Sequence, residues 1–291
     1  DATDARAVAA IFAAKRRPRF NPLIAHVPEA EAAFEIGMAD ARARAVAAAL
    51  WPGPLTLVLP AAPDCPVALL ARAGLDTVAL RVPAHPLAHA LLTAVGRPVA
   101  GPSANVSGRV SPTAAEHVLE ELGGTIDAVL DGGPCAIGLE SSVLDLSGRR
   151  AVLLRPGGAT REAIEAVIGQ VELAEGPDEV RRGPGMLASH YAPVLPVRLE
   201  ATEVAPDEAV LAFGPAPTGA TLAFSLSDSG DRAEAAARLF AGLRTLDAEG
   251  RRRGFVRIAA MPVPCEGLGL AINDRLARAA APRDHVPPSA G

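Results

Sequence analysis

The sequence predicts an α/β protein built from two domains, and three observations lead to this fold class. The chain has 291 residues, which is enough for two domains of ~100–200 residues each. Hydrophobic residues make up 49% of it and aromatic residues only 3%, so we expect a core of Ala, Val and Leu. Apolar strands alternate with Ala-rich helices in residues 1–171 and again in 197–291, and a linker rich in Gly, Pro and charge over 172–196 separates the two regions.

The first domain is predicted to begin with a helix over residues 3–15, capped by Thr3 or Asp4, because its apolar residues share one face. The elements expected next are a strand at 22–27, a long Ala-rich helix at 28–50, strands at 51–61 and 76–83, a helix at 86–96 and a strand at 97–100 that breaks into a loop. A helix at 111–124 follows, with Ser111 as its expected N-cap.

Three short strands at 127–133, 141–146 and 151–157 are spaced like β-hairpins, and a helix at 160–169 closes the first domain. In the second domain, strands at 208–214, 220–227 and 254–261 alternate with helices at 231–250 and 267–281. This alternation predicts a small, doubly wound, Rossmann-like sandwich, and we expect the tail from residue 282 to be frayed.

Composition argues against several classes of protein. The net charge of −5 gives no global electrostatic reason to bind nucleic acid or an anionic membrane. No apolar run approaches the roughly 20 residues of a transmembrane helix. The cysteines Cys65, Cys135 and Cys265 form no CxxC pair, which suits a reducing cytosol without structural zinc. We therefore expect a cytoplasmic protein that does not contact membranes.

Two loop stretches carry candidate chemistry. The segment at residues 15–23 reads KRRPRFNPL and contains Lys15, the only lysine among 28 basic residues. It is interpreted either as a polyphosphate site, with Lys as a point charge and Arg as a bidentate fork, or as a solvated turn in which the lysine survives by chance. The segment at 100–108 reads AGPSANVSG, which is either an anion-binding nest of backbone amides or an ordinary strand-to-helix turn.

Charged side chains inside apolar strands form a second group of candidates. Arg81 and Arg155 each stand between apolar neighbours, and a half-buried guanidinium favours an anionic partner. His26 is a similar exception, although a strand histidine is more often a satisfied core residue. Ser141 follows Glu140 at the mouth of a strand. The sequence contains no P-loop, no GxSxG elbow and no HExxH, so the usual nucleotide, hydrolase and zinc motifs are absent.

Taken in order, several segments resemble one family. They are KRRPRFNPLIAH, WPGPLTLVL, TVALRVPAHP, GPSANVSGRVSPT, ESSVLDL, LLRPG and GPGMLASHYAP. Together they resemble the Sua5/YrdC/YciO family of threonylcarbamoyl-AMP synthases over essentially the whole chain. The linker followed by an α/β domain resembles the two-domain Sua5 branch.

This resemblance implies a fold and a reaction. The fold would be a YrdC-like twisted mixed sheet with a basic concave cleft, followed by a smaller Rossmann-like domain. The reaction would combine L-threonine, bicarbonate and ATP, with Mg²⁺ bridging the phosphates and no metal ligand from the protein. The product, L-threonylcarbamoyl-AMP, would pass to the tRNA threonylcarbamoyl transferase complex for the t6A modification, and contact with tRNA itself would be weak at most.

The resemblance also implies roles for individual residues. ATP contacts fall on Arg17, Asn21, Thr77, Ser103, Ser111, Arg155 and Tyr191. Threonine contacts fall on His26, Arg81, Gly101 and Ser141. Lys15 matches the motif lysine and would act with Arg17 in catalysis, where a small ammonium fits and a planar guanidinium would not. Tyr191 and the linker, with Gly183 and Gly185 as hinges, would form a lid.

One departure from the family pattern leaves other readings open. Family members carry a strand and a loop, with a further threonine contact, ahead of the position of Asp1, so we expect a truncated or misassigned start. A catalytically silent regulator and an RNA-binding module are the alternatives to an enzyme. A carbamoyltransferase accessory domain is disfavoured by the linker and second domain.

Overall fold

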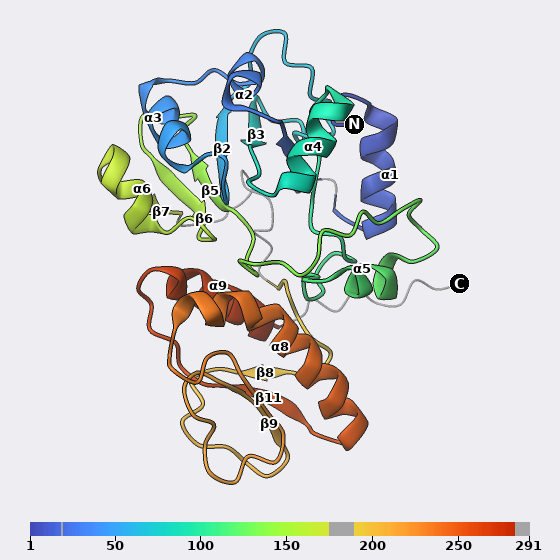
Figure 1. The fold of residues 1–291 in the computed structure, drawn as a ribbon, viewed down its shortest axis with the longest axis vertical. Helices are drawn as coiled ribbons and strands as arrows, with labels where there is room; N and C mark the ends of the chain where they lie inside the picture. The colour runs from blue at the N-terminus through green and yellow to red at the C-terminus, as the bar shows by residue number, and fades with distance from the viewer. Residues whose placement is uncertain (19, 175–188, 283–291) are drawn as a thin grey trace.

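The computed structural model describes residues 1–18, 20–174 and 189–282, and they form two sheets with their own helices (Figure 1). The N-terminal part, up to residue 174, contains the larger sheet, and the C-terminal part lies beneath it in the view of Figure 1. The predicted α/β fold class is confirmed. None of the helices within the described ranges is long and apolar enough to cross a membrane.

The larger sheet has seven strands in the order β4-β1-β3-β2-β5-β6-β7, and antiparallel and parallel neighbours alternate across it. Its strands are β1 Ile24–His26, β2 Leu55–Pro60, β3 Thr77–Arg81, β4 Val99–Ala100, β5 Ser142–Asp145, β6 Val152–Arg155 and β7 Glu172–Leu173. This mixed sheet matters for function because β1, β3 and β6 each end in a basic side chain: His26, Arg81 and Arg155.

Six helices accompany this sheet within the described residues: α1 Ala5–Lys15, α2 Ala30–Ile36, α3 Ala41–Leu50, α4 Pro86–Val95, α5 Ala115–Leu122 and α6 Arg161–Ile168. Asp4 caps α1 by accepting a hydrogen bond from the backbone N–H of Arg6, as predicted. The helix ends where Arg16 takes a left-handed conformation, with φ of 51°. That turn brings Lys15 and Arg17 into different surroundings although they are neighbours in sequence.

The predicted long helix over residues 28–50 is wrong, because two helices, α2 and α3, occupy the segment. Gly37 leaves the helix to form an isolated β-bridge with Ala61. A Cβ at Gly37 would lie 2.9 Å from Leu80, so the backbone approaches the sheet more closely than another residue allows. Asp40 then caps α3 by accepting from the backbone N–H of Ala43 at 2.9 Å.

Two further local predictions are wrong. Ser111 is not a helix cap: α5 follows Ala114, which makes no side-chain cap, and the Ser111 hydroxyl donates to Glu140 instead. Residues 127–133 are not a strand, since they are mostly exposed and pair with no neighbour. The predicted hairpin of β5 and β6 is confirmed, and β7, which was not predicted, pairs with β6 in parallel.

The C-terminal sheet has four parallel strands in the order β10-β9-β11-β8. Its elements are β8 Val197–Arg198, β9 Glu208–Ala212, β10 Ala223–Ser225, α8 Arg232–Arg253, β11 Arg257–Ala260 and α9 Leu268–Ala280. The two helices lie side by side on the face turned toward the N-terminal part (Figure 1). A doubly wound arrangement would need helices on both faces, and the described residues place them on this face. The two glycines predicted as hinges, Gly183 and Gly185, and the tail from residue 283 lie outside the described residues.

Each part has its own apolar core, rich in Ala, Val and Leu as predicted. The first core lies between the larger sheet and its helices and includes Leu57, Leu80 and Leu144. The second core surrounds α8 and also takes in Val110 from the N-terminal part and Tyr191. The C-terminal part is therefore packed against the region that follows β4.

Candidate active site

A cavity of about 230 Å³ opens where the two parts meet. The sheet contributes the basic ends of its strands, and the loop over residues 101–113 contributes a second wall. Tyr191 and Phe240 of α8 close the cavity from the C-terminal side. The predicted site residues that line it are Arg17, His26, Arg81, Gly101, Ser103, Ser111, Ser141, Arg155 and Tyr191.

Arg17 is held rigidly at the edge of this cavity. Its guanidinium donates to the carbonyl oxygen of Asn21 at 3.2 Å, to the side-chain oxygen of Asn21 at 2.7 Å and to the carbonyl of Pro22 at 2.9 Å. Asn21 itself is buried and orients Arg17, but it does not line the cavity. Burial and then the charge of Arg155 lower the pKa of Arg17 to about 10. A bound anion would relieve both effects.

His26, Arg81 and Gly101 come together at one end of the sheet. His26 and Arg81 are register partners on the parallel strands β1 and β3. A Cβ at Gly101 would lie 2.9 Å from the imidazole of His26, so only glycine brings the backbone this close. Arg81 donates to the carbonyl of Gly53 at 3.1 Å, and burial followed by the charge of Arg155 lowers its pKa to about 10. Burial and Arg81 lower the pKa of His26 to about 4, so this imidazole is neutral near pH 7.

Arg155 lies at the end of β6, beside Ser141. Its guanidinium donates to the Ser141 carbonyl at 3.2 and 2.8 Å and to the Ser141 hydroxyl at 3.3 Å. The Ser141 hydroxyl also shares a hydrogen bond of 2.7 Å with Thr56 on β2. Burial lowers the pKa of Arg155. Three guanidinium groups therefore face one small cavity: those of Arg17 and Arg155, which are buried, and that of Arg81, which is partly buried.

Glu140 connects this cavity to the C-terminal part. It accepts a hydrogen bond from Ser111 at 2.7 Å and forms an ion pair of 3.0 Å with Arg275 of α9. Arg275 is fully buried and also binds Asp274 at 2.7 Å and the carbonyl of Pro156 at 2.8 Å. Burial raises the pKa of Glu140, but the charges of Arg275 and Arg155 outweigh it and lower the value to about 2. The carboxylate is thus paired mainly with Arg275, and it forms no ion pair with Arg17 or Arg81 among the described residues.

Tyr191 is fully buried between Arg275 and Phe240. Its ring stacks on Phe240 with 5.3 Å between centroids, and the Arg275 guanidinium lies 5.3 Å from its centroid. The backbone at Tyr191 is left-handed, with φ of 60°. Its hydroxyl and the Nδ1 atom of His190 have no hydrogen-bond partner among the described residues. Both atoms are buried, in residues that contribute to the cavity wall.

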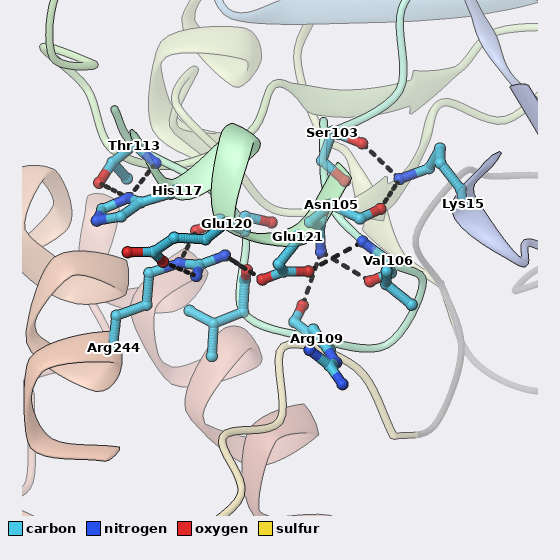
Figure 2. Close-up of polar contacts among 12 residues, drawn as sticks. Lys15, Ser103, Asn105, Val106, Arg109, Thr113, His117, Glu120, Glu121 and Arg244 are labelled. Atoms are coloured by element: carbon cyan, nitrogen blue, oxygen red, sulfur yellow. Dashed lines mark hydrogen bonds and ion pairs between the residues drawn. The ribbon is translucent and has the colours of Figure 1, made fainter. Parts of the chain in front are cut away.

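Lys15 does not line the cavity. Its ammonium donates to the carbonyl oxygens of Ser103 and, at 2.6 Å, Asn105, and so lies behind the loop wall (Figure 2). Burial, followed by the charge of Arg17, lowers the pKa of Lys15 to about 7. Thr77 also lies away from the cavity, at the start of β3 opposite Pro60. The structure thus brings nine of the predicted site residues to the cavity lining and leaves Lys15, Asn21 and Thr77 outside it.

Some contributors to the site had no predicted role. Glu140 was noted only by its position, and His190 lies next to Tyr191 in the linker motif. Arg275 carried no sequence signal, because an arginine on an amphipathic helix is usually solvated. Among the described residues there is no group of three metal-ligating side chains, and Glu140 is the only carboxylate that lines the cavity.

Comparisons with known proteins agree with this architecture. The Sua5/YciO/YrdC family model, described as "Telomere recombination", matches residues 1–157, and a model described as "Threonylcarbamoyl-AMP synthase, C-terminal domain" matches residues 159–281. The threonylcarbamoyl-AMP synthase of Bacillus subtilis is 40% identical over 304 residues, covering 97% of this chain and 86% of the relative. That of Pyrococcus abyssi is also 40% identical, over 97% of this chain and 87% of the relative.

The structural comparison gives the same relationship. The crystal structure of P. abyssi Sua5 complexed with L-threonine superposes with a TM-score of 0.85 and 39% identity, covering 96% of this chain and 86% of that chain. Both domain models and both full-length relatives therefore match across the two parts of the fold. The chain belongs to the threonylcarbamoyl-AMP synthase family, in its two-domain Sua5 form.

Proposed function

We propose that the protein condenses L-threonine, bicarbonate and ATP into L-threonylcarbamoyl-AMP and pyrophosphate in the cavity between its two parts. The observation that carries the proposal is the cluster of Arg17, Arg81 and Arg155 around one small cavity. Arg17 and Arg81 have no carboxylate partner among the described residues, and burial lowers the pKa of both. Such a cluster is stabilised when an anion enters it.

The proposed reaction requires this kind of site. The threonine amine and bicarbonate give a carbamate as the C–N bond forms and water leaves, and a carbamate oxygen then attacks the α-phosphorus of ATP. The bond from that phosphorus to the β-phosphate oxygen breaks, and pyrophosphate leaves. Both reactants are anions, so they meet readily only where fixed cations offset their repulsion.

The threonine subsite is proposed at His26, Arg81, Gly101 and Ser141. Arg81 offers a planar fork for the amino-acid carboxylate. His26 is neutral near pH 7 and so adds no second positive charge beside Arg81. The close approach of Gly101 to His26 leaves backbone groups, rather than a side chain, at this end of the cavity. The threonine complex of the P. abyssi relative supports placing this substrate in the family's fold.

The ATP subsite is proposed at Arg17, Ser103, Ser111, Arg155 and Tyr191, with Asn21 orienting Arg17. Arg17 and Arg155 would offset the phosphate charge, and the hydroxyl of Tyr191, which has no partner among the described residues, would donate to the nucleotide. Thr77 lies too far along β3 to line the cavity, so its nucleotide role has no geometric support. The catalytic role of Lys15 is proposed to be indirect, through the carbonyls of Ser103 and Asn105.

Mg²⁺ is proposed to accompany ATP and to offset phosphate charge. The residues present fit a metal held mainly by phosphates and water, because Glu140 is already paired with Arg275. Arg17 and Arg155 would hold the same phosphates from the protein side. We further propose that the product serves the t6A modification of tRNA in the cytoplasm.

The proposal is tested by incubating the protein with ATP, L-threonine, bicarbonate and Mg²⁺ and measuring threonylcarbamoyl-AMP by chromatography and pyrophosphate by a coupled assay. Both should form in equal amounts, and omission of threonine or bicarbonate should abolish both. The Arg81→Ala variant should need more threonine, whereas Arg252→Ala, on the exposed end of α8, should behave as wild type. Binding of ATP without any product would instead favour the catalytically silent regulator.

A further inference from the structure

The loop over residues 101–113 forms one wall of the cavity, yet none of it is regular secondary structure. Its lining residues include Gly101, Ser103 and Ser111. Such a loop keeps its shape only if its backbone groups are bound on the side away from the cavity. The contacts that do this come from both parts of the molecule.

From the N-terminal side, Lys15 holds the first half of the loop through the carbonyls of Ser103 and Asn105. The side chain of Asn105 continues the arrangement by donating to the carbonyls of Val106 at 3.1 Å and Arg109 at 3.0 Å. Glu121 of α5 then accepts a hydrogen bond of 3.0 Å from the backbone N–H of Val106. Figure 2 shows these groups in one continuous network.

From the C-terminal side, Arg244 of α8 completes that network. Its guanidinium binds the other oxygen of Glu121 at 2.6 Å and donates to the carbonyl of Val110 at 2.6 Å and, more weakly, of Ser111 at 3.4 Å (Figure 2). The side chains of Arg244 and Glu121 are only 15% and 7% exposed, so water screens this ion pair little. One side chain of the second domain therefore binds the end of the loop directly, at Val110 and Ser111, and is connected to Val106 through Glu121.

We propose that Arg244 is a positioning residue for the nucleotide site. By fixing Glu121 and the backbone at Val110 and Ser111, it sets the loop that presents Ser103 and Ser111 to the cavity. The C-terminal domain is then a structural part of the catalytic unit. The inference rests on the proposed function for the identity of the ligand, whereas the geometry of the loop does not depend on it.

The chemistry of arginine explains why this residue type stands here. A guanidinium presents several N–H donors in a fixed plane, so it can bind a carboxylate and two carbonyl oxygens at once. A lysine ammonium at this position would keep the charge but not the fork. Arg252 on the same helix is the matched control, because its ion pair with Glu249 is exposed and lies within α8.

The test compares full-chain wild type with Arg244→Ala, Arg244→Lys, Glu121→Gln and Arg252→Ala. Hydrogen exchange of residues 103–111, ATP affinity by calorimetry, and separate KM values for ATP and threonine are measured. Arg244→Ala should speed exchange in this loop and weaken ATP binding about tenfold or more, with a smaller effect on the threonine KM. Arg244→Lys should recover part of the loss, Glu121→Gln should show the same changes as Arg244→Ala to a smaller degree, and Arg252→Ala should match wild type.

A folded Arg244→Ala protein with wild-type loop exchange and ATP affinity would overturn the inference. So would equal losses for Arg252→Ala, or faster exchange throughout the C-terminal sheet, which would indicate general destabilisation. If Arg244→Ala does not fold, the milder Glu121→Gln decides by the same measurements. Wild type that binds ATP but makes no threonylcarbamoyl-AMP would refute the proposed function, while loop exchange and ATP affinity would still decide the role of Arg244.

Discussion

Four arginines that are buried or partly buried form two pairs with opposite surroundings. Arg17 and Arg81, at the cavity, contact only neutral oxygen atoms within the described part of the chain. Arg244 and Arg275, between the two parts, each pair with a carboxylate, at 2.6 Å to Glu121 and 3.0 Å to Glu140. The first pair has lowered pKa values, whereas neighbouring groups raise that of Arg275 despite its burial.

This difference distinguishes arginines that are suited to bind an anionic ligand from arginines that stabilise the fold, which we call the scaffolding group. A buried cation with a carboxylate partner is already satisfied and serves to hold the fold. A buried cation that has only carbonyl partners remains electrostatically unsatisfied and favours an incoming anion. Residue type and burial alone do not distinguish the two groups, since all four are arginines and each group contains one buried and one partly buried member. What distinguishes them is whether the guanidinium pairs with a carboxylate or only with neutral oxygen atoms.

The largest effect is expected from removing a carboxylate of the scaffolding group. Glu140→Gln removes one of the two carboxylates that pair with the fully buried Arg275 and leaves only Asp274, and breaking a buried pair costs about 3 kcal/mol. Urea unfolding should show a correspondingly lower midpoint. Glu234→Gln, which removes an exposed ion pair with Arg238 on α8, is the matched control and should have a much smaller effect. Equal midpoints for the two variants would place Arg275 in the same class as a surface arginine.

A large effect on turnover is expected from Lys15→Arg. The ammonium of Lys15 fits beneath two carbonyls of the cavity loop, and a planar guanidinium would push Ser103 toward the cavity. A displacement of about 1 Å at a catalytic site costs on the order of 100-fold in rate. We expect a folded protein that makes much less threonylcarbamoyl-AMP in the product assay. Activity within about twofold of wild type would show that the single lysine is retained by chance.

The sequence predicted best those features that depend on neighbouring residues. The Asp4 cap of α1 and the Pro86 and Gly96 boundaries of α4 follow from local rules, and the structure has them. The break between α2 and α3 was missed because it depends on the bridge from Gly37 to Ala61, which a helical pattern cannot show. The prediction of Ser111 as a helix cap was wrong for a similar reason, because its hydroxyl binds Glu140, a residue far away in sequence.

The residues of the candidate site also differ in how far they could be predicted from the local sequence. Arg81 and Arg155 could be predicted because a cation inside an apolar strand is a local anomaly. Arg275 could not, because it lies on an amphipathic helix and becomes buried only when the two parts pack together. Glu121 and Arg244 are hidden for the same reason. Family resemblance supplied residues that line the cavity and, in Lys15, one that holds the loop wall, but not Glu121, Arg244 or Arg275.

Arg17 and Arg81, the two cavity arginines without a carboxylate partner among the described residues, should affect different substrates when each is replaced. Arg17→Ala should weaken ATP binding, and Arg81→Ala should raise the threonine KM, each by about tenfold or somewhat more, because a hydrogen bond to a charged partner contributes about 1.5–3 kcal/mol. Calorimetry with ATP and threonine titrations of turnover measure the two effects. Both variants should stay folded, since their carbonyl partners can bind water. The opposite pattern, with Arg81→Ala weakening ATP, would reverse the two proposed subsites.

The smallest effect expected is a pH dependence of stability that belongs to the scaffolding group. The pKa of Glu140 is lowered from 4.5 in the unfolded chain to about 2 in the folded protein. The ionised carboxylate therefore stabilises the fold fully at pH values above 4.5, and this stabilisation is lost as the pH falls from 4.5 toward 2. Between pH 6 and pH 4, Glu140 should account for a loss of about 1 kcal/mol. Urea unfolding of wild type and Glu140→Gln at pH 6 and pH 4 gives the change in unfolding free energy of each protein. The contribution of Glu140 is the difference between these two changes. The variant should lose less stability than wild type over this interval, because glutamine does not titrate. Parallel pH profiles would mean that folding does not lower the pKa of Glu140. The ion pair with Arg275 would then not stabilise the carboxylate, which would contradict the distinction between the two groups of arginines.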